Sequence, residues 1–133
     1  MILPSLCLGQ IYDKSPKYLH IVDGLILKSP KTFVEMLNSF SHKEISKADT
    51  LIYEDAVIKY GSVMQKWDGA IELTLRLPIC YNDILLDDSS KIQKLSSLDD
   101  NDITRIEFLN RRKSKRLLGK DMPIGCIRLL TKH

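Results

Sequence analysis

The sequence has little that supports catalysis or metal binding. Its three histidines, His20, His42 and His133, are far apart and lack both the spacing of metal ligands and a partnered carboxylate motif. No nucleophile-elbow, zinc-protease or phosphate-binding glycine-loop motif is present. The acidic run from Asp99 to Asp102 lacks the glycine and the closing glutamate of a calcium loop. We therefore expect a protein that is not an enzyme and that has neither a cofactor nor a metal site.

Cysteine and long apolar runs are also scarce. Cys7, Cys80 and Cys126 are odd in number and form no C-x-x-C pair, which argues against a disulfide framework or a zinc knuckle. No run approaches the ~20 apolar residues that span a bilayer. The apolar stretch 1–9 is short, lacks basic residues and contains Pro4, so it is a poor signal peptide. We expect an intracellular protein of the cytoplasm or nucleus, with the inner membrane surface or a virion as further locations.

The sequence of the N-terminal half predicts a hairpin and, further along, one more strand. Two apolar runs, 18–22 and 25–28, flank Asp23-Gly24, a dipeptide that favours a two-residue turn because both positions need a positive φ. One long strand with a glycine bulge is the alternative. From Ala70 to Leu77 apolar and polar residues alternate, which predicts a half-buried antiparallel strand.

Two segments of the same half suggest helices. Ser29 and Pro30 suit an N-cap and a first helical position, and the apolar spacing that follows predicts an amphipathic helix ending near His42. Residues 56–67 are ambiguous, because they fit either two short strands broken at Gly61 or a helical turn interrupted by that glycine.

The C-terminal half predicts an acidic loop followed by strands. We expect a mobile acidic loop over residues 83–103, with a short helix at 89–97. Apolar runs then predict strands at 104–110, 115–118 and 124–130. With 133 residues, 44% of them hydrophobic and 28% charged, the chain suits one soluble domain. We expect residues 1–133 to form a single small α+β domain, in which an antiparallel sheet packs against one or two helices.

Charge separates along the last third of the chain. Residues 83–102 hold six acids and two bases, a net charge of −4, whereas residues 105–133 hold nine bases and two acids, a net charge of +7. The total of +3 hides this local dipole. Local fields rather than total charge attract phosphate or acidic lipid head groups.

Five of these bases lie within six residues and define the basic cluster. Its members are Arg111, Arg112, Lys113, Lys115 and Arg116. We expect the basic cluster at an exposed hairpin tip, where it would bind a polyanion such as RNA or an anionic membrane. A solvated turn without a partner is the plain alternative, and the acidic loop is a hypothetical intramolecular partner that would neutralise the cluster.

One segment resembles a known viral family. It is similar to the aromatic-x-Gly-x-Ile-Glu-Leu-Thr strand in matrix proteins of vesicular stomatitis-type rhabdoviruses, with an upstream Pro-initiated helix and a downstream acidic loop in a similar order. The residues on which the resemblance rests are Trp67, Gly69, Ile71, Glu72, Leu73 and Thr74.

The resemblance implies a non-enzymatic structural protein that self-associates, condenses the viral ribonucleoprotein and bridges it to the anionic inner membrane surface. In this chain the membrane contact would come from the basic cluster. The chain has neither the Lys-rich N-terminal arm nor the Pro-Pro-x-Tyr or Pro-Ser/Thr-Ala-Pro motif of such proteins. Recruitment of the host budding machinery is therefore not implied.

A second interpretation is a small α+β subunit of a larger nucleic-acid-associated cellular complex. Such a subunit would act by pairing an edge strand with a protein partner. The stretch Arg116–Lys120, ahead of Pro123, is similar to the Leu-x-Gly-Lys stretch in the small subunit of alternative clamp loaders, although the spacing after the lysine is shorter.

Overall fold

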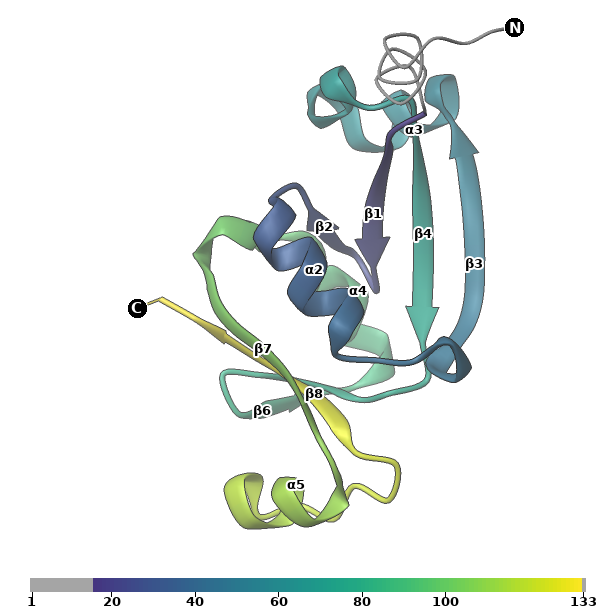
Figure 1. Ribbon diagram of the computed structural model, residues 1–133. Coiled ribbons are helices and arrows are strands. Elements are labelled where there is room, and N and C mark those ends of the chain that lie inside the picture. Colours follow the sequence, from purple (N-terminus) through teal and green to yellow (C-terminus); the bar gives the residue numbers. More distant parts are fainter. Residues whose placement is uncertain (1–15, 133) are drawn as a thin grey trace, which may run out of the picture.

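In the computed structural model, which describes residues 16–132, eight strands form two separate four-stranded sheets (Figure 1). The first sheet contains β1 (Tyr18–Val22), β2 (Leu25–Leu27), β3 (Ile45–Ile52) and β4 (Gly69–Leu75). The second contains β5 (Ile79–Tyr81), β6 (Ile84–Leu86), β7 (Ile103–Leu109) and β8 (Cys126–Thr131). The helices are α2 (Pro30–Asn38), α3 (Tyr53–Tyr60), α4 (Asp88–Ser96) and α5 (Arg111–Leu118), with 3₁₀ turns η1 (His42–Glu44), η2 (Gly61–Lys66) and η3 (Asp100–Asp102). The α+β class predicted from the sequence is confirmed.

Both sheets are mixed, with a parallel pair at the centre. Their strand orders are β2-β1-β4-β3 and β6-β5-β8-β7. The pairs β1/β4 and β5/β8 are parallel, and the outer strands are antiparallel to their neighbours. The expected single antiparallel sheet is therefore wrong in its topology. Alternation along Ala70–Leu77 identified a strand with two unlike faces, but it does not reveal the direction of the neighbouring strand.

The second half of the chain repeats the order of strands and helices of the first, although η2 between α3 and β4 has no counterpart between α5 and β8. A hairpin, a helix, a 3₁₀ turn, an edge strand, a helix and a central strand follow in this order in residues 18–75 and 79–131, which we call the first and second units. The irregularities repeat as well. Bulges follow Ile45 in β3 and Ile103 in β7, and α3 and α5 both end at glycines with φ near +70°, Gly61 (φ 70°) and Gly119 (φ 68°). The chain is thus a tandem repeat of one structural unit.

The hairpin turns of the two units make the same contact. Asp23 in the first turn has φ 50°, and Asn82 in the second has φ 49°. Their backbone N–H groups donate to the carbonyls of Leu73 and Leu129, at 2.9 and 2.8 Å. Asp and Asn tolerate this left-handed conformation better than most residues. The hairpin predicted at Asp23-Gly24 is confirmed, and the single long strand with a bulge is wrong.

The core consists of one shared cluster and two smaller outer clusters. The shared cluster joins buried side chains of both sheets, among them Val22, Leu75, Ile79 and Leu129. One outer cluster lies beneath α3, and the other lies beneath α5. The members under α3 are Leu19, Ile21, Ala56, Met64 and Ala70, and those under α5 are Cys80, Leu109, Met122 and Cys126. Each fully buried Leu, Ile or Met side chain contributes about 1.5–3 kcal/mol.

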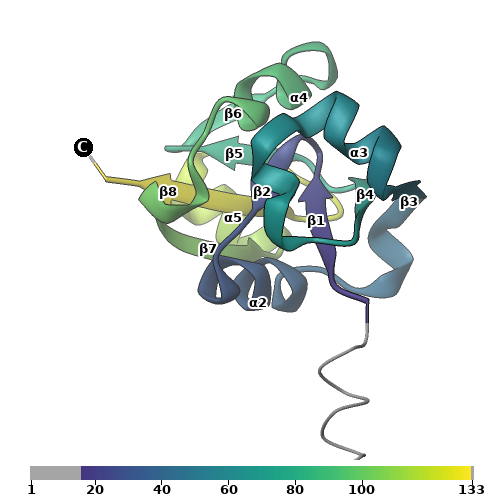
Figure 2. The same ribbon diagram turned by 90° about the horizontal axis from the view of Figure 1, so that it is seen from above.

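Polar contacts between the units reinforce this core. Helix α2 packs against β7 of the other unit and α4 packs against β2, and Figure 2 shows the two helices on opposite sides of the molecule. Lys91 Nζ on α4 lies 3.2 Å from the buried Asp23 carboxylate. Asp100 Oδ2 accepts hydrogen bonds from Ser29 N (2.7 Å) and Thr32 Oγ1 (2.6 Å) at the start of α2. Polar contacts with the opposite unit therefore hold both α2 and α4 in place.

The two helix predictions in the first unit hold in part. Helix α2 begins at Pro30 with Ser29 as its N-cap, as predicted, but it ends at Asn38 rather than near His42. The ambiguous segment 56–67 belongs to α3 and η2, which meet at Gly61. The helical alternative is confirmed, because Gly61 ends the helix at a φ that suits glycine.

Two predictions in the second unit are wrong, and the others are confirmed. Residues 83–103 are mostly regular, because β6, α4 and η3 lie there, so the expected loop is wrong. The helix predicted at 89–97 is confirmed as α4, with Asp87 as its N-cap. Strands near 104–110 and 124–130 are confirmed as β7 and β8. The strand at 115–118, and with it the hairpin tip, is wrong because these residues belong to α5.

Candidate functional site

The basic cluster lies on α5, an isolated helix at one end of the molecule (Figure 1). Asn110 caps the helix, since its Oδ1 accepts from Lys113 N at 2.8 Å. Gly119 ends it in the left-handed conformation, with its N–H donating to Lys115 O at 3.0 Å. Arg, Lys and Leu between these caps are good helix formers. The spacing of Asn110 and Gly119 is the signal that sequence reasoning missed.

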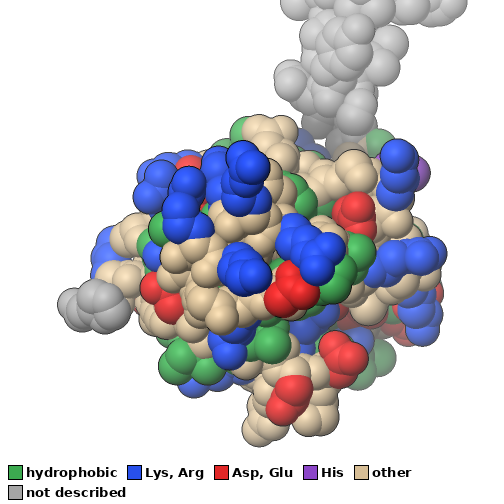
Figure 3. Space-filling model, turned by 90° about the horizontal axis from the view of Figure 1, so that it is seen from below, with side chains coloured by type: hydrophobic (Ala, Val, Ile, Leu, Met, Phe, Trp, Pro, Cys, Tyr) green, Lys and Arg blue, Asp and Glu red, His purple; other side chains and the backbone are tan. Residues whose placement is uncertain are grey.

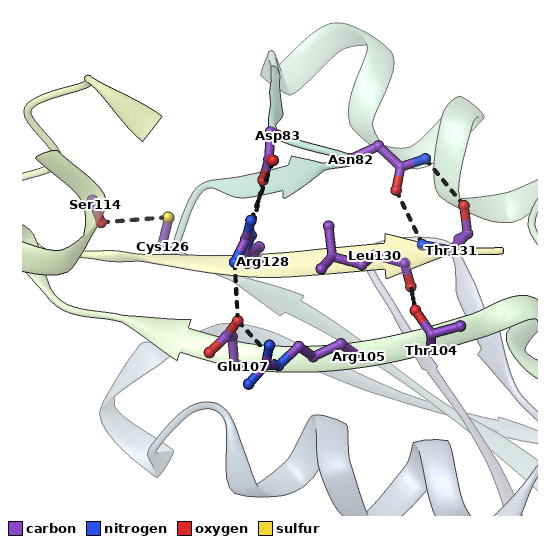
Figure 4. A network of polar contacts seen from close by, with 10 residues as sticks. All are labelled: Asn82, Asp83, Thr104, Arg105, Glu107, Ser114, Cys126, Arg128, Leu130 and Thr131. Carbon is purple, nitrogen blue, oxygen red and sulfur yellow. Dashed lines mark hydrogen bonds and ion pairs between the residues drawn. The ribbon is translucent and has the colours of Figure 1, made fainter. Parts of the chain in front are cut away.

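Helix α5 touches the protein along one narrow side. Ser114 is the buried residue of the helix, and its Oγ donates to Asn110 O at 2.8 Å. The same Oγ lies 3.6 Å from Cys126 Sγ on β8, as Figure 4 shows. Leu118 packs partly against the outer cluster beneath the helix. Because so little of the helix faces inward, the bases surround it on the remaining sides.

All five bases of the basic cluster are exposed. Arg111 forms a two-point ion pair with Asp121, with Nε–Oδ1 2.6 Å and Nη2–Oδ2 3.0 Å, and the guanidinium lowers the pKa of that carboxyl. Within residues 16–132, no ion pair involves Arg112, Lys113, Lys115 or Arg116. Figure 3 views this end of the molecule, and Lys and Arg side chains gather on it. Four cationic groups are thus available to a partner.

The acidic residues 83–102 make their ion pairs elsewhere. Asp83 forms an ion pair with Arg128, and this pair lowers the pKa of Asp83. The same arginine also lies 3.4 Å from Glu107 (Figure 4). Asp99 lies 3.5 Å from Lys28. Within residues 16–132, no carboxylate of residues 83–102 forms an ion pair with the basic cluster, so the hypothesis that the acidic segment neutralises the cluster is wrong for this structure.

The repeat supplies an internal comparison for α5. Helix α3 occupies the same place in the first unit, has the same length and buries one residue, Ala56, at the position of Ser114. Where α5 has Arg112 and Lys113, α3 has Glu54 and Asp55. The fold therefore accepts acids at the positions that hold bases in the second unit.

The placement of three bases in the first turn of α5 opposes the intrinsic electrostatics of a helix, whereas Lys115 and Arg116 lie in the last turn, where bases are favourable. The N-terminus of a helix has a partial positive charge, so acidic side chains are favourable there and basic ones are unfavourable. Helix α3 follows this rule, with Glu54 and Asp55 in its first turn. Helix α5 breaks the rule, with three bases and no acid in its first turn. Residues that break a local rule without a structural gain are typical of functional sites.

The segment that resembles the matrix strand lies in β4, in the other unit. Trp67 is half-buried before the strand, and a Cβ on Gly69 would lie 2.7 Å from Leu51 O. Glu72 binds Lys59 Nζ at 2.6 Å and accepts from the Tyr60 hydroxyl, and these contacts lower its pKa despite partial burial. The other residues of the resemblance, which also lie in β4, are Ile71, Leu73 and Thr74.

The same pattern recurs in the second unit. Gly125-Cys-Ile-Arg-Leu129 matches Gly69-Ala-Ile-Glu-Leu73 in strand position, and a Cβ on Gly125 would lie 2.5 Å from Leu109 O. The glycine and the apolar positions of this segment thus have structural roles in each unit. They are not part of a site with the basic cluster.

Comparison with known proteins adds no family. No protein-family model matches the chain, and neither a curated protein nor a solved structure matches it significantly. Between residues 16 and 132, no three His, Cys, Asp or Glu side chains gather as a metal site would require. None of the helices in this range is long and apolar enough to cross a bilayer.

Proposed function

We propose that the protein binds nucleic acid through the phosphate backbone, with α5 as the contact. The observation that supports this most strongly is the contrast between α5 and α3. The two helices lie in equivalent places and share their length, a glycine at the C-terminal end and one small buried residue, yet only α5 has five exposed bases. The charge of α5 therefore serves a partner rather than the fold.

The shape of α5 favours a phosphate backbone over a lipid bilayer. A helix that lies in a membrane interface needs an apolar face to bury among acyl chains. The inward side of α5, at Ser114 and Leu118, is already used for docking, and Leu117 is the one exposed apolar residue of the helix. An eight-residue helix is about 12 Å long, which suits contacts to a few neighbouring phosphates. We expect binding without sequence preference, since phosphate contacts position a protein but do not read bases.

Salt dependence tests this proposal. Four phosphate contacts predict a slope of about −3 to −4 in a plot of log affinity against log salt for duplex DNA, so affinity falls roughly a hundredfold between about 50 and about 200 mM salt. The variant R112Q/K113Q/K115Q/R116Q should lose most of this affinity and most of the slope. Fluorescence anisotropy with labelled single-stranded and duplex RNA and DNA measures both.

A matched control separates the site from net charge. The variant K31Q/K43Q/K66Q/R76Q also removes four positive charges, but from exposed bases outside α5. Within residues 16–132 these four bases form no ion pair. For this control, the slope of log affinity against log salt should differ from that of wild type by no more than about one. Equal losses in the two variants would mean that binding depends on total charge, and the proposal would be rejected.

The narrower hypothesis is a viral matrix-type assembly protein that bridges ribonucleoprotein and membrane. It rests on the resemblance of β4 and stays a prediction. In the same experiment, vesicles containing phosphatidylserine provide the second arm. Salt-sensitive co-sedimentation of wild type but not of the α5 variant would support bridging, whereas binding to nucleic acid alone would restrict the function to the backbone contact.

A further inference from the structure

Within residues 16–132, no strand pairs with the outer edge of β3. This strand is the longest in the described part of the chain, with eight residues, and it pairs with β4 on one side only. From Ser46 to Thr50 every residue is exposed, so neither face of the strand is covered there. Natural edge strands are usually short, covered, charged or bulged, because unpaired N–H and C=O groups otherwise recruit another strand. Strand β3 has a bulge after Ile45, but from Lys47 to Ile52 it is regularly paired with β4 and its outer edge is straight enough to template a partner.

The equivalent strand of the second unit shows what is missing at β3. Strand β7 is also an edge, but α2 packs against it and its inward Ile106 is buried. The counterpart of Ile106 in β3 is Ala48, which is exposed. Helix α4, the counterpart of α2, packs against β2 instead. The repeat is thus asymmetric here, and no helix in the described part of the chain covers the inward face of β3 as α2 covers β7.

The sequence of this bare strand is complementary to itself. Lys47 and Asp49 flank Ala48 and lie on the same face, where their charged groups are 3.4 Å apart. If two copies of β3 pair antiparallel about a two-fold axis at Ala48, Lys47 of each copy lies opposite Asp49 of the other. Directly opposite charges of unlike sign stabilise an antiparallel pair, and like charges destabilise it.

Only this register gives such matching. A shift of two residues in one direction places Lys47 opposite its own copy, and a shift in the other direction does the same for Asp49. The small side chain of Ala48 at the axis allows the two strands to approach closely. Because register is fixed by the side chains that face each other, the strand specifies one alignment.

We propose that two copies of the protein form a closed dimer through their β3 edges, which joins the two first sheets into one continuous sheet of eight strands. Main-chain hydrogen bonds across the new pair supply affinity, and the two Lys47–Asp49 pairs supply register. A two-fold contact uses the same surface on both copies, so association stops at two. The dimer does not depend on α5 or on nucleic acid.

A charge exchange tests the dimer without disturbing the core. Lys47 and Asp49 are exposed, so K47D and D49K should both fold. In a K47D homodimer acids face acids, and in a D49K homodimer bases face bases, so each should dissociate at least about tenfold more readily than wild type. Mixing the two variants should restore a 1:1 heterodimer, because every opposed pair is then unlike. Sedimentation velocity of the full chain, free of nucleic acid, over a wide concentration range measures these states.

Several outcomes would overturn the proposal. They are a wild-type protein that stays monomeric, variants that dimerise as well as wild type, a mixture that fails to recover the dimer, and association that continues beyond two. Capture of an unrelated strand by a monomeric wild type would assign the edge to a different partner and also reject the dimer. The variant R112Q/K113Q/K115Q/R116Q should dimerise normally, so failure of this proposal is distinguishable from failure of nucleic-acid binding.

Discussion

Replacement of Lys91 by methionine is expected to lower the free energy of unfolding by about 3–5 kcal/mol. Lys91 and Asp23 form a buried ion pair in which the side chains are 8% and 1% exposed. Removal of one partner leaves the other charge buried without compensation, which is far more costly than the net value of the pair. Urea denaturation followed by circular dichroism measures the loss.

The second unit suggests the rescue for this variant. Asn82 occupies the position of Asp23, and its Oδ1 accepts from Thr131 N at 3.0 Å, as Asp23 Oδ1 accepts from Leu75 N at 3.4 Å. An uncharged amide thus suits this turn. The double variant D23N/K91M should recover most of the stability, and a double variant as unstable as K91M would contradict the assigned cause.

The pH dependence of K91M follows from the same pair. Burial raises the pKa of Asp23 above its usual value, and Lys91 opposes this rise. Without Lys91 the folded-state pKa should rise further, so the folded protein binds a proton more tightly than the unfolded chain does. Stability is then lost as pH rises through the window between the ordinary and the raised pKa. K91M should therefore be closer to wild type at mildly acidic pH than at neutral pH.

Replacement of Gly125 by alanine is expected to destabilise the protein by about 3 kcal/mol. An added Cβ would lie 2.5 Å from Leu109 O and 2.6 Å from the Phe108 ring. The φ of Gly125, 86°, is also unfavourable for any residue with a Cβ. Overpacking against the backbone of the buried residue Leu109 adds to this strain.

Gly119 provides the control for backbone strain alone. Its φ is 68°, but an added Cβ would meet nothing within 4 Å. The variant G119A should therefore cost only about 1 kcal/mol, the value for a left-handed residue without a clash. Equal losses for G119A and G125A in thermal or urea denaturation would mean that close packing of β7 and β8 is not the reason for Gly125.

Local signals predicted the parts of the fold that depend on neighbouring residues. Asp23-Gly24 gave the hairpin because its turn needs two positive φ angles, and Ser29-Pro30 gave the start of α2 because Pro suits the first helical position. The parallel pairing of β1 with β4 could not be predicted in this way. It joins strands that are about fifty residues apart, and their sequences do not specify which neighbour each strand receives.

The exposure of the basic cluster was predicted from the sequence, but its helical structure was not. Exposure of the basic cluster followed from its charge, whereas the helix did not, because only Ser114 and Leu118 face inward and two positions are too few for a visible apolar period. The repeat was missed for a related reason. Its units share backbone requirements, such as Gly61 and Gly119, rather than extended sequence identity.

The measurement that tests the central claim most directly is a paired assay of nucleic-acid affinity and thermal stability for the variant R112E/K113D. These substitutions copy Glu54 and Asp55 of α3 into the equivalent first turn of α5. We expect a salt slope lower by about two and an affinity reduced at least about tenfold. The Tm should equal or exceed that of wild type, since acids suit a helix N-terminus. Unchanged affinity and slope in a folded variant would contradict the claim that the charge of α5 serves a polyanionic partner.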